Sequence, residues 1–587
     1  MGEMSSQVRE PIHGYATQPA LVPPPSKSFE AEALRITPRS RTAQILLTYS
    51  PAILALLLML PRLASAEFGL FDDGETVLVA EAIDGGGWAI LSEEASAGRF
   101  RPVHWLQYSL VYSLSGPQPA AFFLWNALVL VVITVELIAL VQLCGGSKLQ
   151  AWLSGFLLVL SGPMVENAYT LSKPELLQSA LLLGGLILFA SLRTGQGPFR
   201  RWGTSGLVSA ILFLGGILTK ETALLMLPIA IAWLMAAYLR FRRGGDAEGL
   251  RRTLALALAA LAAAVVFFIL RGQFLEVSLA GGTYSNNLEL SLPRLGDSAI
   301  RWSGWLIRDF AYLAPLGLLA LIDLAKVRLE QGRLILASLL WSAAWIAIYL
   351  PWEFTVEYYM LPVALGVSVI AGAIVGPVAR RLRGTEQAGP PRWVWAAILP
   401  ALFLWLTTLP NNLTNARQQL AVDQANAEMM DYVAEGLPQA GTLIVNIQQR
   451  NEYVEEIESQ LRELHGLREV RVEVFDPQQG LSSDTSVETL IAFPTVTNQP
   501  LLAVRMGVVQ GTQREWNETF QGAITGRAEP TFEVERSFRL WIVDLPRLLC
   551  PLLRDRGYCR EARPLFDDRV FSYGWDVYRL DGAAQEY

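Results

Sequence analysis

The sequence predicts a polytopic α-helical membrane protein that ends in a C-terminal extracytoplasmic α/β domain. Of the 587 residues, 52% are hydrophobic and only 17% are charged, which is too apolar for a soluble enzyme. Apolar runs recur over residues 45–409, whereas residues 410–587 alternate between helix-like and strand-like patterns. The net charge of −7 argues against a nucleic-acid partner.

The apolar runs give a count of about 11 transmembrane helices. They cover residues 45–60, 122–143, 149–163, 176–192, 204–218, 222–239, 253–270, 310–325, 334–350, 358–377 and 393–409. The runs 149–163 and 204–218 are shorter than the roughly 20 residues that a bilayer requires. The loops assigned to the inner side carry 16 Lys and Arg, against 8 in the outer segments before residue 410. The positive-inside rule therefore predicts a cytoplasmic N-terminus and a C-terminal end outside, in a plasma-membrane protein.

Three regions are expected along the chain. Residues 1–43 are polar and proline-bearing, which predicts a disordered cytosolic leader. Residues 44–409 form the membrane domain, with a long first outer loop at 67–120. The sequence around residue 65 resembles a signal-peptidase site, but the long leader favours an uncleaved anchor.

Residues 410–587 are predicted to be a soluble domain outside the membrane. We expect helices at 421–435 and 453–464, strands at 442–447 and 470–475, and later strands at 501–509 and 539–543. This region holds 17 Arg, no Lys and 27 Asp plus Glu, so it is a poor binder of anionic phosphates. Cys550 and Cys559 are predicted to form a disulfide, because an exported domain permits one.

The first outer loop begins with a paired carboxylate just past the first span. Phe68 to Glu75 reads Phe-Gly-Leu-Phe-Asp-Asp-Gly-Glu, so Asp72 and Asp73 are adjacent. Adjacent residues of a helix do not share a face, so only one of the two can point at a given spot. The simpler interpretation is a helix start, where acidic residues favour the positive end of the helix dipole.

A second set of charges lies in the loop before residue 176. It reads from Gly162 through Glu166 to Lys173-Pro174-Glu175. Ser172 followed by Glu175 is also typical of a capping box that opens the next span. That interpretation leaves Glu166 and Lys173 unexplained.

Two further outer loops carry charges between apolar runs. Lys220-Glu221 interrupts one such stretch, either as a solvated turn or as an anion-binding cation. Glu357-Tyr358 lies in an aromatic segment before Pro362, where rings at a membrane interface are usually belt residues.

Taken in order, these motifs resemble the GT-C glycosyltransferases. The similar members are the protein O-mannosyltransferases, the lipid A aminoarabinose transferases and the tetratricopeptide-linked O-mannosyltransferases. The resemblance covers residues 45–409 and includes Arg99-Phe100-Arg101-Pro102 before an expected interfacial helix. Tyr358 departs from the pattern, because the family has an arginine at the corresponding place.

The resemblance implies transfer of a sugar from a polyprenyl-phosphate carrier to an extracytoplasmic protein, lipid or glycan acceptor, with inversion at the anomeric carbon. Such a reaction needs a carboxylate base and cations for the departing phosphate. The resemblance nominates Asp72 as the base and Asp73 as its rival. The residues expected to bind the donor phosphate or substrate are Arg99, Arg101, Glu166, Lys173, Glu175, Lys220, Glu221, Glu357 and Tyr358.

Two other functions remain open at this point. A transporter or lipid-linked-glycan flippase would place charged residues within spans, and Glu136 is the clear example. A catalytically inactive GT-C scaffold would have the same sequence pattern. No Cys/His cluster with zinc spacing exists. The sequence therefore implies no cofactor, and leaves open a divalent metal held by carboxylates.

Overall fold

The structure is a computed structural model of the full chain. It describes residues 38–70, 72–96, 100–194, 202–245, 247–274, 289–323, 329–352, 357–384, 392–445, 451–474, 489–497, 530–539, 542–543, 566–567 and 570–580. The chain divides into two units between Leu47 and Thr48, and apart from the first residues of the first helix the features below belong to Thr48–Tyr587.

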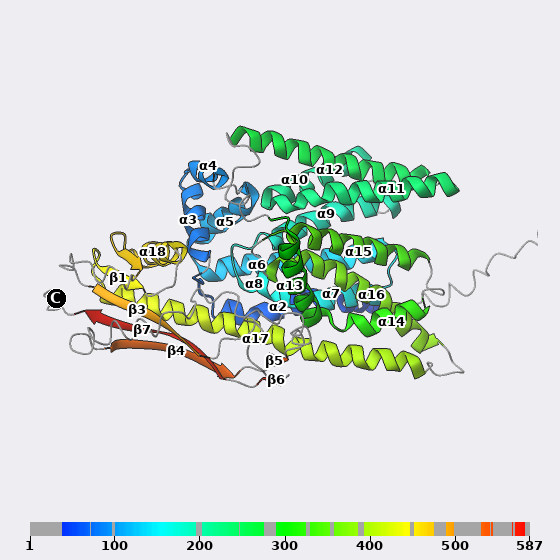
Figure 1. The fold of residues 1–587 in the computed structure, drawn as a ribbon. Helices are drawn as coiled ribbons and strands as arrows, with labels where there is room; N and C mark the ends of the chain where they lie inside the picture. The colour runs from blue at the N-terminus through cyan, green and yellow to red at the C-terminus, as the bar shows by residue number, and fades with distance from the viewer. Residues whose placement is uncertain are drawn as a thin grey trace, which may run out of the picture. The chain divides into compact units, whose positions relative to one another are not determined.

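The membrane part is a bundle of helices (Figure 1). In chain order, its elements are α2 (Pro38–Ala64), α6 (Pro119–Leu143), α7 (Lys148–Val159), α8 (Gly162–Tyr169), α9 (Glu175–Thr194), α10 (Trp202–Thr219), η1 (Glu221–Leu225), α11 (Met226–Gly244), α12 (Ala247–Phe274), α13 (Leu292–Phe310), α14 (Leu313–Asp323), α15 (Leu329–Tyr349), η3 (Glu357–Met360), α16 (Leu361–Gly384) and α17 (Arg392–Gly436). Within the described residues, seven helical segments are long and apolar enough to cross a membrane. The chain is therefore an integral membrane protein, as the sequence predicted.

The expected spans that fall short of this test are short or bent helices. The run 149–163 is a pair, α7 and α8, that bends by 56° and would give an eighth span if counted as one. The runs 176–192 and 204–218 correspond to the shorter apolar helices Glu175–Ser191 and Thr204–Thr219. The run 310–325 contains only the 11-residue α14. The count of eleven stays a prediction.

One span lies at the centre of the bundle. The segment Glu357–Gly376, which includes η3 and the start of α16, has 94% of its apolar window buried by the protein itself. The other six candidate spans have 28–50% buried, which leaves their remaining surface for lipid. This span is therefore surrounded by neighbouring elements rather than by lipid.

The first outer loop folds into three helices, α3 (Asp73–Asp84), α4 (Ala89–Ser96) and α5 (Pro102–Ser115). Gly85 follows the last residue of α3, and Gly86 has φ 85°, a backbone conformation that glycine adopts without strain. Pro102 occupies the first position of α5, where its missing N–H costs nothing. The sequence predicted a helix directly after Arg99-Phe100-Arg101-Pro102, and α5 begins at Pro102.

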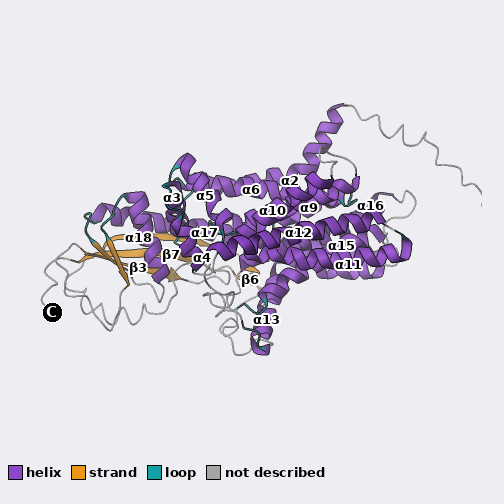
Figure 2. Ribbon diagram, turned by 90° about the horizontal axis from the view of Figure 1, so that it is seen from above, coloured by secondary structure: helices purple, strands orange, loops and turns teal. Residues whose placement is uncertain are grey.

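Helix α17 runs on from the membrane bundle into a mixed sheet, and Figures 1 and 2 both show the sheet beside its C-terminal half. The strands are β1 (Thr442–Val445), β2 (Arg471–Val474), β3 (Thr489–Thr497), β4 (Pro530–Arg539), β5 (Ile542–Val543), β6 (Phe566–Asp567) and β7 (Val570–Leu580). The five-stranded sheet has the order β2-β1-β3-β7-β4, and β5 pairs with β6 separately. Strand β1 is parallel to both β2 and β3, whereas β7 is antiparallel to β3 and β4.

A buried core joins α17 to this sheet. It includes Met429 and Val433 of α17 and Trp575 of β7. Asn426 of α17 accepts hydrogen bonds from Tyr573 Oη (2.8 Å) and Trp575 Nε1 (2.9 Å). The second helix of this region, α18 (Asn451–His465), lies between β1 and β2 in the chain and packs against α3 of the first outer loop.

The sequence located several of these elements. The helix expected at 421–435 is the end of α17, and the helix expected at 453–464 is α18. The strands expected at 442–447 and 470–475 are β1 and β2, and the expected 539–543 segment covers the end of β4 and β5. The leader up to residue 37, the expected strand 501–509, Cys550 and Cys559 lie outside the described residues.

Candidate active site

Asp72 stands at the start of α3 in a strained backbone conformation. Its φ of 62° is in the left-handed region, which residues with a Cβ rarely adopt. The turn is held by Thr76, whose N–H (3.1 Å) and hydroxyl (2.6 Å) both donate to the carbonyl oxygen of Asp72. The side chain is 38% exposed. The backbone of Asp72 is therefore held in place, whereas its carboxylate is accessible to solvent.

Two residues from the loop before α9 contact this carboxylate. Lys173 Nζ lies 3.0 Å from Asp72 Oδ2, and Ser172 Oγ lies 3.3 Å from the same oxygen. Lys173 Nζ also donates to Ser172 Oγ at 2.8 Å. Ser172 lies three residues before α9 begins and has φ 54°. The capping-box interpretation of Ser172 is thus wrong, because its hydroxyl joins the Asp72–Lys173 pair.

Asp73 has a different environment from its neighbour. Its residue is 2% exposed, and its Oδ2 accepts the N–H of Gly69 at 2.8 Å. Burial, and next the charge of Asp423, raise the pKa of Asp73 to about 7. Of the adjacent pair, only Asp72 is open to a substrate.

A second buried lysine lies close by. Lys220 pairs with Glu175, whose side chain is completely buried. Its ammonium group faces three tyrosine rings, with centroid distances of 4.2 Å to Tyr359 and 5.5 Å to Tyr349 and Tyr358. Burial lowers the pKa of Lys220 to about 8, and the charge of Glu175 opposes this shift. Lys220 is therefore largely protonated at neutral pH.

Tyr358 links the two lysines. Lys173 Nζ lies 5.1 Å from its ring centroid, and Lys220 Nζ lies 5.5 Å from the same centroid. The ring belongs to η3, at the start of the central span. The position that departs from the family pattern thus holds an aromatic ring beside both cations.

Arg101 and Glu221 form a more exposed pair at the same end of the bundle. Arg101 Nε lies 4.0 Å from Glu221 Oε2, and Glu221 Oε1 accepts the N–H of Phe100 at 3.0 Å. The two side chains are 15% and 24% exposed. This pair joins the start of α5 to η1. Arg99 lies outside the described residues.

Glu357 belongs to a separate buried cluster. It pairs with Arg308 of α13, whose Nε and Nη2 also bind both carboxylate oxygens of Asp309 at 2.9 and 2.8 Å. Glu166 of α8 is half-buried and adds negative charge near Glu357. Arg308 therefore ties α13 to η3, and Asn167 of α8 joins η3 by donating from Nδ2 to the carbonyl oxygen of Tyr358 at 3.0 Å.

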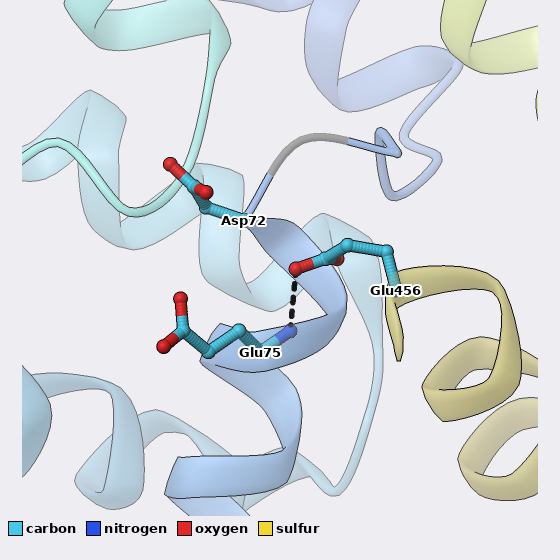
Figure 3. Close-up of side chains that lie close together, drawn as sticks. All are labelled: Asp72, Glu75 and Glu456. Carbon is cyan, nitrogen blue, oxygen red and sulfur yellow. Dashed lines mark hydrogen bonds between the residues drawn. The ribbon is translucent and has the colours of Figure 1, made fainter. Parts of the chain in front are cut away.

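One group of carboxylates has the arrangement of a cation site. Asp72, Glu75 and Glu456 each place an oxygen within 4.8 Å of the others (Figure 3). The oxygens of Glu456 already accept the N–H groups of Gly74 (2.5 Å) and Glu75 (3.1 Å). Burial raises the pKa of Glu456 well above its usual value, and the charge of Asp72 adds to the shift. Carboxylates of this kind fit a hard divalent cation, whereas the observed bonds fit a helix cap.

The sequence missed several residues of this region. Tyr349 lies inside an apolar run, Arg308-Asp309 directly precedes another, and Glu456 is one of several acidic residues on α18. Ser172 was named from the sequence only as a capping-box residue. Only the clustering of tyrosines near residue 358 could have indicated an aromatic surround for a cation.

The sequence matches no protein-family model and no curated protein. Among solved structures, ArnT from Cupriavidus metallidurans bound to undecaprenyl phosphate has a TM-score of 0.47 and 14% identity, and the match covers 93% of this chain and 99% of that one. AglB from Archaeoglobus fulgidus, in complex with an inhibitory peptide and a dolichol-phosphate, has a TM-score of 0.47, 10% identity and coverages of 91% and 93%. The mycobacterial arabinofuranosyltransferase AftD has a TM-score of 0.39, 15% identity and coverages of 90% and 41%.

All three are GT-C glycosyltransferases. They belong to the superfamily that the outer-loop motifs resemble. Every identity is 15% or less and every TM-score lies below 0.5, so these similarities assign no residue role and no substrate to this chain.

Proposed function

We propose that this protein is a membrane glycosyltransferase that moves a sugar from a polyprenyl-phosphate carrier to an acceptor on the outer face. One observation carries the proposal. Asp72, an accessible carboxylate, pairs with Lys173, and the ring of Tyr358 lies near both that lysine and a second buried one, Lys220. A base and two cations are the groups that displacement of a phosphate by a hydroxyl requires.

The reaction breaks the bond between the anomeric carbon and the phosphate oxygen. Asp72 takes the proton of the acceptor hydroxyl while that oxygen bonds to the anomeric carbon from the opposite side, with inversion. The phosphate leaves with the electron pair of the broken bond. Lys173 and Lys220, with Arg101, stabilise the charge that develops on it.

The Lys173–Asp72 pair gives this mechanism an order of events. While Lys173 Nζ lies 3.0 Å from Asp72 Oδ2, that oxygen faces the lysine rather than an acceptor hydroxyl. A bound carrier phosphate offers Lys173 a second anionic partner. Contact with that phosphate weakens the pair and leaves Asp72 Oδ2 available to the acceptor hydroxyl when the donor is in place.

The orientation of the chain is part of the proposal. The N-terminus lies in the cytoplasm of a plasma-membrane protein, and residues 410–587 form an α/β domain outside. The asymmetry of 16 inner against 8 outer basic residues supports this arrangement. Protease accessibility of tags at the two ends tests it, and two cytosolic ends would contradict it.

Activity is tested with the full-length protein in lipid nanodiscs. A panel of undecaprenyl-phosphate and dolichyl-phosphate sugars is offered, because two of the similar structures hold these carriers. The wild type should release free polyprenyl phosphate, and Asp72→Asn should lower the rate by about 10²- to 10⁴-fold. Asp84→Asn, an exposed carboxylate at the other end of α3, is the matched control and should leave the rate unchanged.

Two results would overturn the proposal. The first is full turnover by Asp72→Asn with the same folded yield. The second is wild-type protein that turns over no donor in the panel with any supplied protein, lipid or glycan acceptor.

A further inference from the structure

The helix that carries the proposed base has its amino end capped by a residue nearly four hundred positions away. The first N–H groups of a helix have no partner within the helix. Asp72 occupies the capping position of α3, but its side chain makes no capping hydrogen bond. Glu456 of α18 does so instead: its two oxygens accept the N–H groups of Gly74 and Glu75, and Figure 3 shows the bond to Glu75.

The contact between the two elements is close. A Cβ on Gly74 would lie 2.6 Å from Glu456 Oε2, 3.0 Å from the carbonyl oxygen of Glu456 and 3.3 Å from Ser459 Cβ. No larger residue fits there without moving α18. Glycine at this position thus lets α18 reach the backbone of α3.

A second hydrogen bond joins α18 to the segment before the base. Gln460 Nε2 donates to the carbonyl oxygen of Gly69 at 2.7 Å. Gln460 lies one helical turn beyond Glu456, so both side chains project from the same face of α18. Together they hold the chain on both sides of Asp72.

The two helices stay in contact further along. Glu81 lies two turns after Gly74, and Glu463 lies two turns after Glu456. A side-chain hydrogen bond between Glu81 and Glu463 raises the pKa of Glu81 to about 7. The two helices therefore touch at a second place, two turns beyond the first.

We propose that α18 positions the catalytic carboxylate, with Glu456 as the positioning residue that acts through the backbone of α3. This inference rests on the proposed function of Asp72. An aspartate keeps the left-handed backbone conformation only where several surrounding contacts hold it there. Glu456 and Gln460 supply that constraint from the sheet region, which gives residues beyond the membrane bundle a role in the reaction.

Three variants of the full-length protein test this role. Glu456→Gln keeps one acceptor oxygen for the two amides, and Glu456→Met keeps none. Glu458→Gln is the matched control, because Glu458 lies on the same helix and is exposed.

The first measurement is hydrogen exchange of the peptide that contains Gly74 and Glu75, which requires no turnover. Exchange should rise about three- to thirty-fold in Glu456→Met, the factor that a lost helix cap typically represents. It should rise less in Glu456→Gln and stay at the wild-type rate in Glu458→Gln. Unchanged exchange in Glu456→Met would overturn the capping role, whether or not the protein transfers sugars.

The second measurement separates catalysis from binding. A mispositioned base should lower kcat while leaving the affinity for undecaprenyl phosphate unchanged, with Glu456→Gln between the wild type and Glu456→Met. Equal kcat values for Glu456→Gln and Glu456→Met would show that the charge of Glu456 matters rather than its hydrogen bonds. That result, or a kcat unchanged in both, would overturn the positioning role.

Discussion

Asp72 and Ser172 are the two residues in the described part of the chain that adopt left-handed backbone without being glycine, and their side chains touch. The hydroxyl of Ser172 lies 3.3 Å from Asp72 Oδ2, although the residues are 100 positions apart. Strained residues gather where a structure must hold a group in one position. Two of them meeting at one carboxylate supports the assignment of Asp72 to the reaction.

This contact predicts that stability and turnover change in opposite directions in Ser172→Gly. Glycine removes the strain of the left-handed conformation, which should raise the free energy of unfolding by about 1 kcal/mol. It also removes the hydroxyl that contacts Asp72 and Lys173, so turnover should fall. Ser172→Ala is the control, since it loses the hydroxyl but keeps the strained Cβ. Thermal unfolding and sugar transfer measure both effects, and a glycine variant that is less stable than the alanine variant would contradict the strain argument.

The pKa of Lys220 predicts how carrier binding depends on pH. Lys220 is protonated below a pKa of about 8 and neutral above it, because burial disfavours its charge. The affinity for undecaprenyl phosphate should therefore fall as pH rises through about 8. A charge-assisted hydrogen bond contributes about 1.5–3 kcal/mol, so the loss should reach about tenfold or more.

Lys220→Gln provides the control for this pH dependence. It should bind undecaprenyl phosphate weakly at every pH, with no transition near pH 8. Titration of the binding by calorimetry or fluorescence checks both proteins. A transition that persists in Lys220→Gln would assign it to another group.

Asp73 predicts a pH dependence of stability rather than of binding. Its folded-state pKa of about 7 lies above the ordinary value of 3.8, so folding favours its protonated form. Stability is therefore fully present below pH 3.8 and is lost as pH rises from there through about 7. Asp73→Asn mimics the neutral form, and its unfolding free energy should exceed that of the wild type above pH 7, by up to roughly 4 kcal/mol.

The same variant separates the two adjacent carboxylates. Asparagine keeps an oxygen for the N–H of Gly69, so Asp73→Asn should fold and retain turnover. Unfolding followed below and above pH 7 gives the stability change. A loss of turnover in Asp73→Asn as large as that in Asp72→Asn would make Asp73 the base.

The sequence predicted the membrane fold class because that class depends on local signals. Long apolar runs indicate spans, and charges at their ends stand out against them, so Asp72, Lys173, Glu175 and Lys220 could be named as candidates. The sequence did not show which of these charged residues form ion pairs with each other. Lys173 meets Asp72 across 101 positions, and Lys220 meets Glu175 across 45.

Other features carry no local signal at all. Glu456 lies on an acidic helix beside Glu455 and Glu458, and only the packing of α18 against α3 distinguishes it. The sequence predicted no element for the residues of β3. The position of this strand beside β1 depends on pairing between segments that are distant in the chain. Such contacts are decided by tertiary packing, which a single sequence does not encode in any local pattern.

The ion pair between Arg308 and Glu357 predicts that Glu357 stabilises the fold, whereas the family resemblance implies that it binds substrate. Arg308 is buried and pairs with both Asp309 and Glu357. Removing one partner of a buried ion pair leaves uncompensated charge, so Arg308→Met should lower the free energy of unfolding by about 3–5 kcal/mol. Arg301→Met, at an exposed position of the same helix, is the control.

Glu357→Gln makes the decisive comparison. Glutamine still offers Arg308 an acceptor oxygen and Asp309 keeps its pair, so the loss should be smaller, about 1–2 kcal/mol. In the double variant with Arg308→Met, the two losses should not add, because both changes remove the same pair. Affinity for undecaprenyl phosphate should stay at the wild-type value in Glu357→Gln, because its carboxylate faces Arg308 rather than the two lysines at Tyr358. Wild-type stability combined with lost carrier binding would instead assign Glu357 to the substrate.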